Sequence, residues 1–74
     1  MLGGSVKFYS WLLKQKQRQD VVGDFARYAT KKDKFFPRNK NQLGIILLRY
    51  EELPEQRESA KIAHREWRKN GNVA

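Results

Sequence analysis

The sequence predicts an all-α fold, a small bundle of four helices packed as two helical hairpins. Apolar residues recur at helical spacing in four segments, and no segment alternates apolar and polar residues as a strand does. Breakers separate the segments, of which Pro37 and Pro54 are the clearest. The 74 residues suffice for one domain. We expect it to cover residues 6–69, between a flexible N-terminal tail at 1–5 and a C-terminal tail at 70–74.

The first helix is predicted over residues 6–17. Ser5 is its expected N-cap, because a serine hydroxyl can accept a backbone N–H that has no partner inside the helix. Phe8, Trp11 and Leu12 follow i, i+3, i+4 spacing, so they should share the buried face.

The second helix is predicted over residues 20–33, with Asp20 as its N-cap. Its apolar stripe is made by Val22, Phe25, Ala26 and Ala29. Gly23 weakens the helix by about 1 kcal/mol relative to alanine, so we expect it to permit the close approach of another helix.

Residues 34–40 are predicted to form a loop, because Pro37 disfavours helical geometry at the residue before it. Either Phe35 or Phe36 should plug the bundle, and an exposed Phe35 would be free to stack on a base or pack on a partner. The third helix is predicted over 41–52 with Asn41 as N-cap. Because this helix is apolar on nearly all sides, we expect it to be central and buried.

The fourth helix is predicted to begin near Pro54, a residue suited to a first helical turn, and to end near Lys69. Ala60, Ala63 and Trp67 should line its buried face. A second face carries basic residues at helical spacing, which are Arg57, Lys61, His64 and Arg68, with Arg65 at its flank.

These landmarks together resemble one family. They are the Phe8-Tyr9-x-Trp11-Leu12 start, Gly23-Asp24-Phe25-Ala26, Asp33-x-x-Phe36-Pro37 and the late Trp67. The chain is similar to the YozE SAM-like family of short, largely uncharacterised bacterial proteins over about residues 6–69. The resemblance implies a four-helix, SAM-like bundle with a longer C-terminal helix, and it implies no activity. This chain is more basic than typical members, and its third helix is more apolar.

The sequence contains no pattern of catalytic residues. Its one histidine, His64, is expected on a solvated face, with no cysteine in the chain to help it hold a metal. There is no Ser/His/Asp spacing and no glycine-rich phosphate loop. We therefore expect a protein that is not an enzyme, with no catalytic or metal site, no cofactor and no small-molecule substrate.

The expected location is the cytoplasm, and the expected state is soluble. The absence of cysteine fits a reducing compartment. The start of the chain is too short and polar for a signal peptide, and the longest apolar run, residues 45–48, is far shorter than a membrane span. We expect no membrane partner.

The formal charge of +8 is distributed unevenly. Residues 31–40 hold five basic side chains against one acid, and the basic face of the fourth helix adds more. Dense positive charge favours polyanions, although cations also suit helix C-termini and promote solubility. The candidate nucleic-acid-binding residues are Lys31, Lys32, Lys34, Arg38, Lys40, Arg57, Lys61 and Arg68.

The expected function is binding of DNA or RNA through backbone phosphates, with weak sequence preference. This expectation requires the two basic groups to converge in the fold. The alternative is a protein–protein interaction module without a nucleic-acid role, which the unusually apolar third helix favours.

Overall fold

The computed structural model describes residues 6–71, so the expectations for the tail at 1–5, for the Ser5 cap and for residues 72–74 lie outside it. The described residues form helices and no strands, which confirms the all-α prediction. Two of the helices end in a π-helical turn, labelled η. The elements in chain order are α1 (Phe8–Lys14), α2 (Val21–Arg27) with η1 (Tyr28–Lys32), α3 (Leu43–Arg49), and α4 (Pro54–Glu66) with η2 (Trp67–Gly71).

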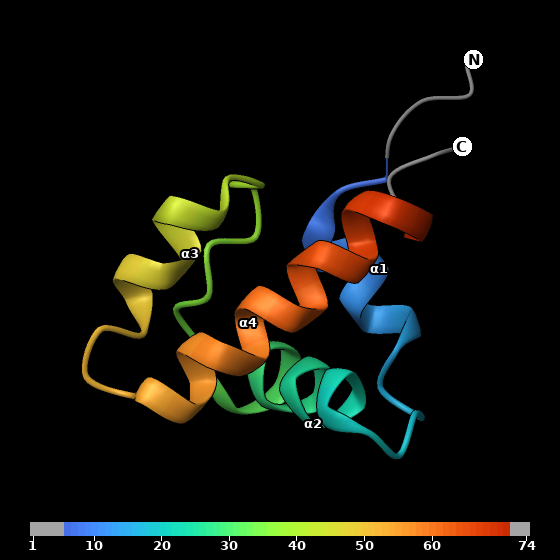
Figure 1. Ribbon diagram of the computed structural model, residues 1–74, viewed down its shortest axis with the longest axis horizontal. Coiled ribbons are helices and arrows are strands. Elements are labelled where there is room, and N and C mark those ends of the chain that lie inside the picture. Colours follow the sequence, from blue (N-terminus) through green and yellow to red (C-terminus); the bar gives the residue numbers. More distant parts are fainter. Residues whose placement is uncertain (1–5, 72–74) are drawn as a thin grey trace.

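The helices pack as the two predicted hairpins. α1 contacts α2 and η1, and α3 contacts α4, while α4 also packs along α2. Figure 1 shows α4 crossing the middle of the molecule, with α3 on one side, α1 on the other and α2 below. The long α4–η2 helix is therefore the element on which the others are assembled.

One hydrophobic cluster fills the space between the helices. Its largest fully buried side chains are Tyr50, Phe8, Phe25, Leu12 and Ile46. Ala60 and Ala63 lie on the buried face of α4 beside His64, so that neighbouring helices can approach closely where the side chains are small. The core positions predicted from helical spacing are confirmed, namely Phe8, Trp11, Leu12, Val22, Phe25, Ala26, Ala29, Ala60, Ala63 and Trp67.

The start of α2 is capped as predicted. The Oδ1 atom of Asp20 accepts a hydrogen bond of 2.9 Å from the Gly23 backbone N–H. Gly23 does permit a close approach, but the neighbour is not a helix. A Cβ atom at Gly23 would lie 2.0 Å from the backbone oxygen of Arg18, in the connection between α1 and α2. The glycine is therefore required by the path of that connection.

The segment after η1 is held by Asp33, whose side chain is 1% exposed. Its carboxylate accepts hydrogen bonds from Arg49 Nε at 3.0 Å, Tyr50 Oη at 2.8 Å and the Phe35 N–H at 3.0 Å. Burial alone would raise the pKa of Asp33, but the hydrogen bonds from Arg49, Tyr50 and Phe35 together outweigh it, so the pKa lies below its ordinary value. Asp33 thus joins the end of η1 to the end of α3.

The two aromatic residues of this segment divide as expected for neighbours in a loop. Phe36 is buried against the rings of Phe8 and Phe25, whereas Phe35 is 80% exposed. The Phe35 ring lies beneath the Arg49 guanidinium, and the Cζ atom of Arg49 is 5.6 Å from the centroid of the ring.

Three predictions for α3 are wrong, namely its extent, its burial and its cap. The helix spans only Leu43–Arg49, and its sole fully buried residue is Ile46, while Leu48 is 66% exposed. It lies at the edge of the bundle and packs mainly on α4, so its second apolar side has no neighbour. Asn41 does not cap it either, because Gln42 occupies the N-cap and the Asn41 Oδ1 instead accepts the Phe8 N–H of α1 at 3.1 Å.

Replacing Asp33 tests the buried carboxylate. We expect Asp33→Asn to lower the free energy of unfolding by about 2–3 kcal/mol, because the amide cannot satisfy Arg49 and the other donors. The pKa of Asp33 is lowered on folding, so its contribution is complete above about pH 4 and is lost as the pH falls through the folded-state pKa. Urea unfolding from pH 7 to pH 2 should show a smaller acid dependence of the unfolding free energy in the variant.

Asp24→Asn is the control. It removes an ion pair with Arg27 at a side chain 74% exposed, so it should change the free energy of unfolding by less than about 0.5 kcal/mol.

The two helical glycines should respond oppositely to alanine. Gly23→Ala should destabilise the protein by about 1–3 kcal/mol, since the new methyl group meets backbone and no side-chain movement can relieve the clash. A Cβ at Gly44 would meet nothing within 4 Å, so Gly44→Ala should stabilise by about 0.5–1 kcal/mol through helix propensity alone. Urea unfolding followed by circular dichroism measures both, and equal effects would contradict the placement of Gly23.

Candidate nucleic-acid interface

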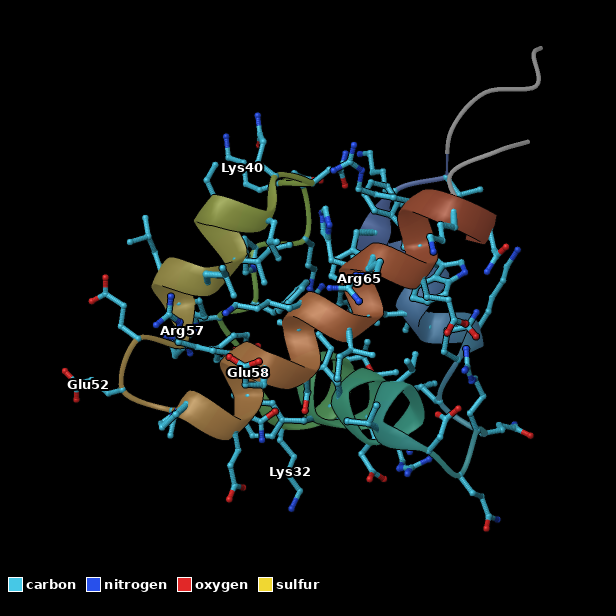
Figure 2. All side chains as sticks on the ribbon, in the orientation of Figure 1. Lys32, Lys40, Glu52, Arg57, Glu58 and Arg65 are labelled. Atoms are coloured by element: carbon cyan, nitrogen blue, oxygen red, sulfur yellow. The ribbon has the colours of Figure 1, made fainter. Side chains whose placement is uncertain are left out.

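A basic cleft lies between the start of α3 and the C-terminal half of α4 with η2. Its volume is about 490 Å³, and it is lined by Leu43, Lys61, His64, Arg65, Arg68 and Lys69. The four cations follow i, i+4, i+7 and i+8 spacing, which places them on one side of the helix. Figure 2 shows Arg65 near the C-terminal end of α4, where that helix continues into η2. We call this surface the α4 cleft.

The charge of the α4 cleft is largely uncompensated. Lys61 pairs with the exposed Glu58 at 3.1 Å. Within residues 6–71, no acidic oxygen lies within 4.0 Å of a cationic nitrogen of Arg65, Arg68 or Lys69. Three adjacent cations therefore remain available to an anionic ligand.

Glu66 is the acid closest in sequence to these cations, and it is bound elsewhere. Its carboxylate accepts hydrogen bonds from the Arg18 guanidinium, which also pairs with Asp20. The hydrogen bonds that Arg18 donates, first to Glu66 and then to Asp20, raise the pKa of Arg18 above its ordinary value. Arg18 therefore stays charged and keeps Glu66 directed away from the cleft.

The floor of the α4 cleft contains His64, which the sequence placed wrongly on a solvated face. The imidazole is 5% exposed and packs against the rings of Phe8 and Trp67, each with its centroid 5.1 Å away. Its Nε2 lies 2.7 Å from the Asn41 carbonyl oxygen, and since a carbonyl only accepts, Nε2–H donates. Around the helix, His64 lies about 40° from the buried Ala60, so it belongs to the edge of the core.

The other candidate residues do not gather at the cleft. Lys61 and Arg68 line it, but Arg57 lies about one turn before Lys61, where its Nε atom is buried without a hydrogen-bond partner among the described residues. In Figure 2, Arg57 lies near the C-terminal end of α3, while Lys40 and Lys32 lie at opposite edges of the molecule.

The basic segment 31–40 is spread along the surface. Lys31 and Lys32 line a separate hollow beside Asp24, Arg27 and Gln56. Lys34 is exposed, and the Arg38 guanidinium stacks on the Tyr9 ring, 5.1 Å from its centroid. The structure therefore does not unite this segment with the basic face of α4.

Sequence reasoning missed Lys69 and treated Arg65 only as a flanking residue. Arg65 and Lys69 lie four and eight residues after Lys61, and this spacing, which places side chains on one face of a helix, is visible in the sequence. The contribution of Leu43 was not visible, because it depends on how α3 lies against α4.

Residues 6–71 contain neither a cluster of metal ligands nor a helix that could span a membrane. No group of three or more His, Cys, Asp or Glu side chains there is arranged to hold a metal ion. No helix in that range has both the length and the apolarity needed to cross a bilayer.

Comparisons with known proteins identify the fold family and nothing closer. No curated protein and no solved structure shows significant similarity to the chain. The family model described as the YozE SAM-like fold matches residues 7–69, which include all of α1, α2, α3 and α4. The chain therefore belongs to the YozE SAM-like fold family.

Proposed function

We propose that this protein is a binding protein, not an enzyme, and that it binds nucleic acid through the phosphates in the α4 cleft. The observation that supports this proposal is the row of three unpaired cations, Arg65, Arg68 and Lys69, on one rigid helix beside a hollow. Cations that are fixed by a helix lose less conformational entropy on binding than cations on a loop.

The spacing of the cations suits a nucleic-acid backbone. Lys61 and Lys69 are eight residues apart, so they span about 12 Å along the helix axis. Each strand of a duplex presents one phosphate about every 3.4 Å along the duplex axis, so a row of this length can face about three phosphates. Multiple phosphate contacts favour a polymer over a single small anion.

Weak sequence preference follows from the composition of the α4 cleft. Its lining contains no Asn or Gln for adenine and no exposed aromatic ring on which an unpaired base could stack. We therefore place the contacts on the phosphates of DNA or RNA, with little reading of bases. The absence of cysteine is compatible with a cytoplasmic protein, which is where we place this activity.

The proposal is tested by titrating a labelled 20-base-pair duplex with the protein and measuring fluorescence anisotropy. The protein should bind at 50 mM salt. With three phosphate contacts, the affinity should fall roughly 40-fold between 50 and 200 mM salt. Arg65→Gln/Arg68→Gln/Lys69→Gln should abolish most of the binding and of its salt dependence.

The matched control is Lys31→Gln/Lys32→Gln/Lys34→Gln, which removes the same number of charges outside the α4 cleft. It should retain binding within about threefold, because distant exposed charges are largely screened. Failure of the parent protein to bind at 50 mM salt would end the proposal. An equal loss in both triple variants would show that net charge, and not the cleft, causes binding.

A further inference from the structure

A second surface lies at the other end of α4 and has the opposite charge. It comprises the outward side of α3 and the turn into α4, and we call it the α3 outer face. Its apolar side chains are Ile45, Leu48 and Leu53, which are 38%, 66% and 44% exposed, and Phe35 lies beside it under Arg49. Exposed apolar side chains that are contiguous mark interaction sites more often than isolated ones do.

The α3 outer face contains a hollow of about 400 Å³. It is lined by Leu48, Arg49, Glu51, Glu52 and Leu53. The charge of Arg49 is already matched by Asp33, to which it donates from both Nε and Nη2. The two leucines therefore form an apolar floor, and the glutamates form its rim.

The acids at this rim are the ones that the fold leaves unpaired. Among residues 6–71, Asp20, Asp24, Asp33, Glu58 and Glu66 all form ion pairs. Glu51, Glu52 and Glu55 form none within the same range and are exposed. Negative charge is therefore concentrated in the α3–α4 turn, and Figure 2 shows Glu52 at the outer end of the molecule.

The positive charge of the α4 cleft does not cancel this local field. Glu55 and Arg65 lie on the same helix, ten residues or about 15 Å apart along its axis. This separation exceeds the Debye length of about 8 Å at physiological ionic strength. Arg57 lies near the C-terminal end of α3, but the three glutamates of the rim outnumber it, so a ligand at the α3 outer face meets a net negative charge.

We propose that the α3 outer face docks a basic amphipathic helix of a protein partner. Apolar residues of that helix, spaced i, i+3 or i+4, would pack on Leu48 and Leu53, while its lysines or arginines would face Glu51, Glu52 and Glu55. The charge of the rim selects this occupant. A two-fold pairing of two copies would bring identical acidic rims together, and anionic lipid or nucleic acid would be repelled by them.

The test uses two fluorescein-labelled 18-residue peptides with the same leucine positions. In one peptide the remaining positions are mostly lysine, and in the other they are mostly glutamate. Fluorescence polarisation at 150 mM salt should show that the full chain binds the lysine peptide at least tenfold more tightly than the glutamate peptide. Leu48→Ser/Leu53→Ser should weaken binding at least tenfold, as the loss of a central apolar contact does.

Two further variants separate charge from packing. Glu51→Gln/Glu52→Gln/Glu55→Gln should remove most of the preference for lysine. Leu13→Ser, at a leucine 41% exposed on α1, is the matched control for Leu53 and should leave peptide affinity unchanged. The α3 variants should keep duplex binding, so failure here and failure of the α4 cleft are distinguishable. Circular dichroism should show native helix content in each variant.

Three results would overturn the proposal. The first is equal affinity for the two peptides, and the second is an equal loss of affinity in Leu13→Ser. The third is a dimer detected by sedimentation that Leu48→Ser dissociates, which would assign the α3 outer face to a second copy of the chain.

Discussion

The α4 cleft depends on the way Asn41 joins three elements. Its side-chain oxygen accepts the N–H of Phe8, the first residue of α1, and its main-chain oxygen accepts the Nε2–H of His64 on α4. The first N–H groups of a helix have no partner within it, and a buried polar group without a partner costs about 1–3 kcal/mol. Asn41 satisfies one such group on α1 and one on α4, and it lies two residues before the start of α3.

The same junction determines which side of α4 faces solvent. His64 is held between Phe8 and Trp67, and the Trp67 Nε1–H donates to the Val6 carbonyl at 2.8 Å. With these two side chains directed into the core, the rotation of the C-terminal half of α4 is fixed. The cations at Lys61, Arg65 and Lys69 must then emerge beside Leu43, so the cleft is a consequence of core packing.

Local signals in the sequence were sufficient for the helices and most of the core. The Asp20 cap and the start at Pro54 each depend on residues only a few positions away, whereas the burial of Phe36 rather than Phe35 depends on the distant rings of Phe8 and Phe25. Asparagine is also a common helix N-cap, but the Asn41 side chain accepts a hydrogen bond from a donor 33 residues away. Nothing in the sequence distinguishes a local cap from such a distant contact. The apolar surface of α3 indicated burial, yet a seven-residue helix at the edge of the bundle has a neighbour on one side only.

Charge illustrates the same distinction between neighbours in sequence and neighbours in space. Ten residues of extended chain can span about 30 Å, whereas residues 61–69 of a helix lie within about 12 Å, so only the helical cations stay together. The helix dipole explains part of their placement, because it favours cations in the last turn, where Arg68 and Lys69 lie. Arg65 lies in the last turn of α4, where the dipole also favours a cation, and it is exposed without an ion pair among the described residues. Arg65 is thus directed to solvent by the same rotation of α4 that places His64 and Trp67 in the core, and not by an ion pair within residues 6–71.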